Sequence, residues 1–244
     1  MLERSARIDR VLDGDTVVLD DGTHVRLIGV DTPELGKRDR PAQPGAQAAR
    51  DFLGKLLPAG TPVGLDFDAE RTDRHGRTLA HLFLEDGGNV QQRVLAAGAG
   101  TPLTVPPNTA FLDCYRAASG AALQAGLGLW SMPQYRPTVA RTLPDSARGY
   151  HVVHGSVSRR AESATSLWLE LDGRIALRIE RGDLTYFRGF DLVDVTGATL
   201  EARGMIYRRN GQLRMRIRHP ADLLGLSPDT GTAVRAFRSE EVIR

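Results

Sequence analysis

The stretch VRLIGVDTPE, residues 25–34, decides how the first half of the chain is interpreted. Its first part, Val25–Val30, is apolar on both faces of an extended chain and predicts a buried β-strand, which Arg26 interrupts. A buried guanidinium is costly unless an anion meets it. Two interpretations of Arg26 stay open from these residues alone: a salt bridge to a core carboxylate, or a clamp that binds phosphate through two parallel hydrogen bonds.

The end of this stretch, Asp31–Glu34, has the composition of a helix start, but a glycine and two prolines within residues 35–44 forbid a helix. Its carboxylates therefore need another explanation. Asp15 is also unexplained, because the preceding Asp-Gly turn does not require it. Asp15, Asp31 and a carbonyl such as that of Thr32 would form an open oxygen site for Ca²⁺. The absence of His and Cys from this set argues against zinc and copper.

Short β-runs separated by turn signals surround this stretch. Helices are expected over residues 45–57, 89–97 and 108–125, the last two with an asparagine available as N-cap. The expected strands are 6–12, 16–19, 25–30, 62–67 and 78–84. Five strands with three interleaved helices fit a five-stranded closed barrel of the OB type.

The second half of the chain predicts a separate β-domain. Residues 132–149 contain three prolines and no periodicity, as expected for a linker between a first domain at 1–131 and a second at 150–226, with a tail at 227–244. The strands expected in the second domain are 151–158, 166–171, 174–180, 200–209 and 213–218. We therefore predict a mainly β fold with some helix (α+β), in which an OB-type barrel precedes a second, smaller OB-like barrel.

The composition sets few limits on function. With 244 residues, 41% of them hydrophobic and 25% charged, the chain is an ordinary globular protein, which excludes collagen-like, coiled-coil and disordered classes. A net charge of +2 is too small to indicate an anionic partner. The single cysteine excludes an intramolecular disulfide, and no apolar run could span a bilayer or form a signal peptide, so no membrane association is expected.

Three segments hold the residue types that phosphodiester hydrolysis needs: DGDT at 13–16, RLIGVDTPE at 26–34 and DRHGR at 73–77. Taken singly, the first and third are typical polar turns. Taken together, DGDTV, VRLIGVDTPE and DRHGRTLAHLFL, followed by NVQQRVLAAG and GLGLW, closely resemble the staphylococcal nuclease (thermonuclease) family over about residues 6–130. The resemblance implies a calcium-dependent phosphodiesterase that cuts DNA, RNA or both to give 3′-phosphate ends, and it leans towards a secreted or periplasmic enzyme.

The resemblance also implies a metal site. Asp15, Asp31 and the backbone carbonyl of Thr32 would hold the calcium ion, while Asp13 and Asp73 would position the residues around it.

The catalytic roles follow from the same resemblance. Glu34 would orient or deprotonate the attacking water, and Arg26 and Arg77 would bind the scissile phosphate and stabilise its transition state. The match does not extend to the base-stacking residues: His75 stands where the best-known members carry a tyrosine, and residues 101–108 lack the tyrosines that flank the nucleotide there. His75 is therefore a candidate substrate contact of a different kind.

Two basic groups outside these segments are further candidates for contact with nucleic acid. Lys37, Arg38 and Arg40 lie in the loop beside Glu34, where they would either contact the substrate strand or remain solvated.

The last expected strand of the second domain carries the other group. It alternates apolar residues with Arg214, Arg216 and Arg218, which places three arginines on one face, with Tyr207 close enough to stack on a base. This face would either tether nucleic acid or be an ordinary solvated surface.

Two other functions are compatible with these residues. The chain could be a catalytically silent nuclease-like module that binds nucleic acid or protein, or a structural tandem barrel in which Arg26 pairs with Asp31. In each case we expect a monomer without an obligate protein partner.

Overall fold

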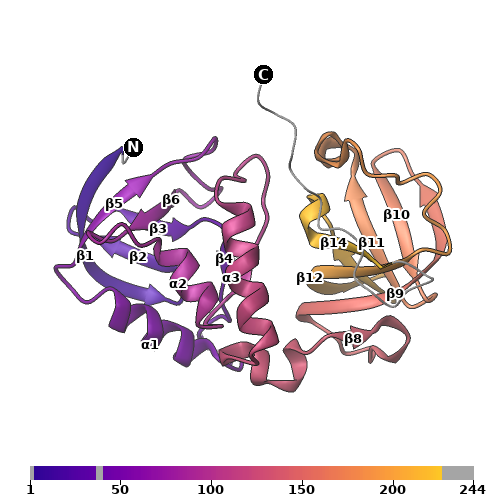
Figure 1. Cartoon of the computed structure of the whole chain (residues 1–244), viewed down its shortest axis with the longest axis horizontal. Coiled ribbons are helices and arrows are strands. Elements are labelled where there is room, and N and C mark those ends of the chain that lie inside the picture. The colour runs from indigo at the N-terminus through magenta and orange to yellow at the C-terminus, as the bar shows by residue number, and fades with distance from the viewer. Residues whose placement is uncertain (1–2, 37–40, 227–244) are drawn as a thin grey trace. The chain divides into compact units, whose positions relative to one another are not determined.

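The computed structural model describes residues 3–36 and 41–226, and the chain divides into two compact units, Met1–Pro133 and Gln134–Arg244 (Figure 1). Each unit is built on a closed five-stranded barrel, so the predicted mainly β fold with two OB-like barrels is confirmed. Lys37, Arg38, Arg40 and the predicted tail lie outside the described residues. No helix in the part of the chain that the structure describes is long and apolar enough to cross a membrane.

The first barrel has the strand order β1-β2-β3-β6-β5 and closes where β1 pairs antiparallel with β5. Neighbouring strands are antiparallel except β3 and β6, which run parallel. The strands of this unit are β1 (Arg4–Asp13), β2 (Thr16–Leu19), β3 (His24–Leu27), β4 (Val30–Asp31), β5 (Pro62–Asp66), β6 (Thr78–Phe83) and β7 (Thr101–Pro102). Their inward side chains share one apolar core with Leu53 of α1 and Val94 of α2.

The described part of the first unit contains three α-helices: α1 (Ala46–Leu56), α2 (Val90–Ala96) and α3 (Leu112–Gln124). Asn89 caps α2 as predicted, because its side chain accepts a hydrogen bond from Gln92 N. The predicted start of α3 at Asn108 is wrong. Asn108 instead bonds both backbone groups of Glu70, and this use of its side chain leaves the helix to begin four residues later.

The predicted strand 25–30 is also wrong in one respect, because a turn at Ile28–Gly29 divides it into β3 and β4. Gly29 has a φ of 83°, and a Cβ there would lie 2.4 Å from the ring of Tyr115. The turn takes β4 out of the barrel wall, so that it pairs with β7. Asp31 on β4 nevertheless stays in contact with Arg26 on β3. Apolar patterning alone does not reveal such a turn.

We expect Gly29→Ala to lower the free energy of unfolding by about 2–5 kcal/mol, because it combines an unfavourable positive φ with overlap against a buried ring. Gly22→Ala is the matched control: Gly22 has a φ of 82°, but a Cβ there would meet nothing within 4 Å, so only about 1–2 kcal/mol should be lost. Urea denaturation of both variants measures the difference, and equal losses would contradict the role of the Tyr115 contact.

The second barrel repeats the strand order of the first. Its strands run β9-β10-β11-β13-β12, pairing of β12 with β9 closes the barrel, and β11 and β13 are the one parallel pair in it. The strands of this unit are β8 (Thr138–Val139), β9 (Gly149–Glu162), β10 (Ser166–Leu171), β11 (Ile175–Glu180), β12 (Thr199–Arg209), β13 (Gln212–Arg216) and β14 (Leu223–Leu226). The hairpin between β12 and β13 turns at Asn210-Gly211, both with positive φ, as a two-residue turn requires.

The segment predicted as a linker, residues 132–149, contains short 3₁₀ helices and β8, which pairs with β9. This segment therefore carries ordered structure of its own. The exact domain boundaries stay a prediction.

Candidate active site

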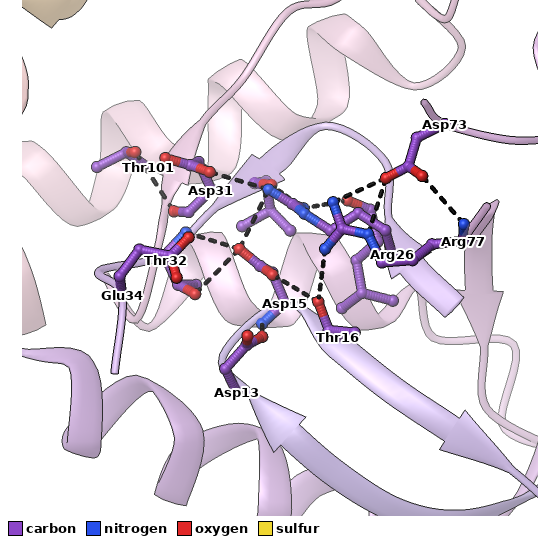
Figure 2. A network of polar contacts seen from close by, with 12 residues as sticks. Asp13, Asp15, Thr16, Arg26, Asp31, Thr32, Glu34, Asp73, Arg77 and Thr101 are labelled. Carbon is purple, nitrogen blue, oxygen red and sulfur yellow. Dashed lines mark hydrogen bonds and ion pairs between the residues drawn. The ribbon is translucent and has the colours of Figure 1, made fainter. Parts of the chain in front are cut away.

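Four segments of the first unit bring polar side chains to one place (Figure 2). Asp15 lies in the tight turn between β1 and β2, and Arg26 on β3 is the cross-strand neighbour of Thr16. Asp31 is at the end of β4, and Arg77 directly precedes β6. β2, β3 and β6 are adjacent in the barrel. The sequence segments 13–16, 26–34 and 73–77 therefore meet at one end of these strands.

The Asp15 carboxylate is the centre of this cluster. Its Oδ2 accepts hydrogen bonds from the backbone N and the Oγ1 of Thr32, at 3.0 and 3.1 Å, and lies 3.1 Å from Nη2 of Arg26. Its Oδ1 accepts a hydrogen bond from Thr16 Oγ1 at 3.0 Å. Asp15 and Thr32 are both only 6% exposed, so the segment after β4 is held firmly against the first turn.

Arg26 contacts both carboxylates and carbonyl oxygens, whereas its part in phosphate binding stays a prediction. Nη2 donates to Asp31 Oδ1 at 2.9 Å and contacts Asp15, while Nη1 donates to the carbonyl oxygens of Leu27 and Val30 at 2.7 and 2.6 Å. Only 11% of its side chain is exposed. The guanidinium therefore neutralises two carboxylates, and it also ties the turn at Ile28–Gly29 to the barrel.

Arg77 is held differently, from one side only. Asp73 accepts hydrogen bonds from the Arg77 backbone N, at 3.0 Å, and from its Nε, at 2.8 Å. Nη1 of Arg77 lies 3.4 Å from Thr16 Oγ1, which is long for a hydrogen bond. Although burial acts to raise it, these bonds and one from His75 N hold the pKa of Asp73 below its usual value. Asp73 thus fixes Arg77 and leaves its outer nitrogen weakly engaged.

The remaining carboxylates show that negative charge accumulates here. Burial, followed by repulsion from Asp15, raises the pKa of Asp13 to about 6. Burial also raises the pKa of Asp31 to about 6 despite the attraction of Arg26, with Asp15 and Glu34 adding to the rise. Glu34 itself is exposed, and Gln43 holds its backbone at both the N and the O atom.

The donor chemistry of the cluster fits a hard cation. Among the described residues, no group of three or more His, Cys, Asp or Glu side chains is already arranged as a metal centre. Yet the carboxylates of Asp15 and Asp31 both contact Nη2 of Arg26 and so lie close together, and they supply oxygen, the ligand that Ca²⁺ prefers. Burial raises the pKa values of Asp13 and Asp31, with repulsion from neighbouring carboxylates adding to the rise, and a bound cation would favour their charged forms.

The structure brings together most of the residues singled out from the sequence, and it adds others. Thr16, Gln43 and Thr101 were missed: Thr16 bonds Asp15 and approaches Arg77, and Thr101 Oγ1 lies 3.4 Å from the carbonyl oxygen of Asp31. Thr16 directly follows the DGD segment, so proximity in sequence could have indicated it. Gln43 could not have been found, because no pattern marks it.

Two further groups of candidate contacts lie outside the hydrogen-bonded cluster, one beside it and one in the second unit. His75 is exposed in the turn before Arg77, where its Nε2 accepts a hydrogen bond from Arg74. The alternation predicted for the end of the second unit is seen, since Arg214, Arg216 and Arg218 are more exposed than the apolar residues between them. Arg216, however, is paired with Glu180 and Asp183, at 2.7 and 3.0 Å.

Comparisons with known proteins relate the first half of the chain, which contains this cluster, to one family of nucleases. A family model described as "Staphylococcal nuclease homologue" matches residues 24–132. The thermonuclease of Staphylococcus intermedius is 38% identical over 126 residues, which are 50% of this chain and 74% of that protein. The thermonuclease of Staphylococcus hyicus is 35% identical over 53% of this chain and 77% of that protein. Endonuclease YncB of Bacillus subtilis is 35% identical over 52% of this chain and 62% of its own length.

Proposed function

The chain belongs to the staphylococcal nuclease family, and from this premise we propose that it is a calcium-dependent nuclease. It hydrolyses the phosphodiester bonds of DNA, RNA or both, and its products carry 3′-phosphate ends. One observation supports this proposal most strongly: two arginines from different segments, Arg26 on β3 and Arg77 directly before β6, are joined through Asp15 and Thr16 into a single polar cluster. A purely structural salt bridge between Arg26 and Asp31 would not need Arg77 in this position.

In the proposed site Asp15, Asp31 and the carbonyl oxygen of Thr32 would hold Ca²⁺. When bound, the ion supplies charge neutralisation at the phosphate. Asp13 accepts a hydrogen bond from Asp15 N at 3.2 Å, and so fixes the turn that presents Asp15.

The protein's own groups would carry out the remaining steps. Glu34 is exposed and accepts a proton from the attacking water, whose oxygen then forms the new bond to phosphorus. Arg26 and Arg77 donate hydrogen bonds to the phosphoryl oxygens as negative charge grows on them. The P–O5′ bond breaks, the 5′-oxygen takes a proton from solvent, and the phosphate remains on the 3′-oxygen.

We further propose that residues 1–131 carry the chemistry and that residues 150–226 tether the substrate. Arg214, Arg216 and Arg218, the candidates for this tether, lie on one side of the last barrel strand and its extension. His75 would contact the substrate beside Arg77, and Lys37, Arg38 and Arg40 would do so beside Glu34.

End analysis of the products tests the reaction. Labelled single-stranded DNA and RNA digested with Ca²⁺ should give fragments that a polymerase extends only after a phosphatase has removed the 3′-phosphate. Glu34→Gln should lower kcat by about 100-fold, the usual size of a lost general base. Glu70→Gln, at an exposed glutamate outside the site, is the control and should leave kcat unchanged. Products with a free 3′-hydroxyl would contradict cleavage of the P–O5′ bond.

A further inference from the structure

The outer face of the second barrel contains a hollow of about 200 Å³, and of the residues that line it only Arg214 has been given a role above. Residues of four neighbouring strands, β9, β10, β11 and β13, line it. It includes the parallel pair β11–β13, which corresponds in strand order to the pair β3–β6 of the first barrel.

The register of these strands explains the hollow. Arg159, Glu170, Ala176 and Arg214 are successive cross-strand partners and therefore lie in one row on one face. The neighbours of Ala176 along β11, Ile175 and Leu177, are fully buried in the barrel core, so Ala176 points outwards. The long side chains around Ala176 leave it only 3% exposed, and its small size leaves room for the hollow between them.

One wall of the hollow is an aromatic ring stacked with arginines. The guanidinium carbon of Arg214 lies 4.8 Å from the centre of the Trp168 ring, and that of Arg178 lies 5.6 Å from it. Trp168 is only partly buried and lies on the outward face of the barrel, where it does not fill the core. A large aromatic ring in this position is therefore a candidate for ligand binding.

Polar groups complete the rim. Arg159 Nε donates to Glu170 Oε2 at 2.8 Å, and Gln212 Oε1 accepts from Arg214 Nε at 3.3 Å. The arginines thus outnumber the single glutamate that lines the hollow. A flat ring, amide and carboxylate acceptors and surplus positive charge together match an unpaired nucleotide, which offers a π-face, polar edges and a phosphate.

We propose that this hollow binds one unpaired nucleotide of the nucleic acid strand. The base stacks against the pair formed by Trp168 and Arg214, its polar edge meets Gln212 and Glu170, and the adjoining phosphates contact Arg159 and Arg214. The inference rests on the proposed nuclease function. It assigns substrate binding to Arg214 rather than to Arg216, whose charge Glu180 and Asp183 already neutralise.

Binding of a single-stranded oligonucleotide to the full chain in chelator tests the proposal, with a gel to confirm that the strand stays intact. Trp168→Ala should weaken binding by about 5- to 150-fold, the range for one lost base–aromatic stack. Ala176→Leu fills the hollow without removing a ring or a charge and should weaken binding comparably. Arg209→Gln, at an exposed arginine without a place in the hollow, is the charge-matched control for Arg214→Gln.

Fluorescence gives a second measurement. The chain has two tryptophans, and Trp130 is 3% exposed in the other unit, so quenching by the oligonucleotide should come from Trp168 and vanish in Trp168→Ala. Arg214→Gln should also flatten the dependence of log Kd on log salt by about 0.7, while Arg209→Gln should not.

The two proposals fail in different ways. Unchanged oligonucleotide affinity in both Trp168→Ala and Ala176→Leu, with normal cleavage of a dinucleotide, would overturn the nucleotide site and leave the nuclease intact. Loss of binding in both variants, with a wild-type chain that cleaves nothing, would support the nucleotide site and contradict the proposed nuclease function.

Discussion

Arg77→Ala is expected to lower kcat by about 100-fold or more while the protein stays folded, because one lost donor to a developing oxyanion costs that much. Asp73 holds this guanidinium through Nε and Nη2, so the group is positioned before any substrate arrives. Among the described residues, its remaining nitrogen, Nη1, makes only the long contact to Thr16, and it is the donor that a phosphate would take. The side chain is 32% exposed, so its loss leaves no closed cavity.

Steady-state kinetics on single-stranded DNA measure this effect, with circular dichroism to confirm folding. Arg74→Ala is the matched control, because Arg74 lies in the same turn and is exposed, and it should retain normal kcat. Arg26→Ala should show a similar loss of kcat together with lower stability, since it leaves Asp15 and Asp31 without their partner. A normal kcat in folded Arg77→Ala would refute the role given to Arg77.

Removal of divalent cations is expected to reduce cleavage to background, and Ca²⁺ should restore it. The carboxylate oxygens of Asp15 and Asp31, together with the proposed Thr32 carbonyl ligand, suit a large cation with flexible coordination, whereas Mg²⁺ demands near-ideal octahedral geometry and should restore little activity. Cleavage rates in chelator and after titration with each metal give the measurement. Equal rates with and without chelator would contradict the metal site.

Calorimetry with Ca²⁺ tests the same site without reference to activity. Asp15→Asn and Asp31→Asn should each weaken calcium binding, because each removes a charged ligand. Asp86→Asn, at an exposed carboxylate that pairs with Arg93, should bind calcium as the wild type does. Calcium affinity that is unchanged in all three variants would place the ion elsewhere.

Much of the fold could be predicted because its signals are local. Alternating apolar residues and Asp-Gly or Asn-Gly turns marked the strands of both barrels, and Asn89 marked the start of α2. The two errors arose where a distant partner decides the local structure. Gly29 turns against the ring of Tyr115, and Asn108 bonds the backbone of Glu70 rather than capping α3.

The candidate site was predictable in its residues but not in its connections. The resemblance to the staphylococcal nuclease family indicated Asp15, Arg26 and Arg77, whereas the contacts through Thr16 depend on the register of β2 against β3. The hollow around Trp168 was not foreseen for the same reason. The hollow is formed by cross-strand neighbours from different segments of the chain. The sequence LWLEL of β10 taken alone predicts a strand but does not show which residues lie beside it in the sheet.

The parallel pairing of β3 with β6 has a consequence for the synthesis of the protein. Arg26 lies on one of these strands and Arg77 immediately before the other, so the two are neighbours only once the barrel wall between them has formed. A growing chain that has not yet released β6 from the ribosome therefore holds Arg26 and the carboxylates around it but not Arg77 in its place. The topology thereby delays completion of the cluster until the ribosome has translated well past β6.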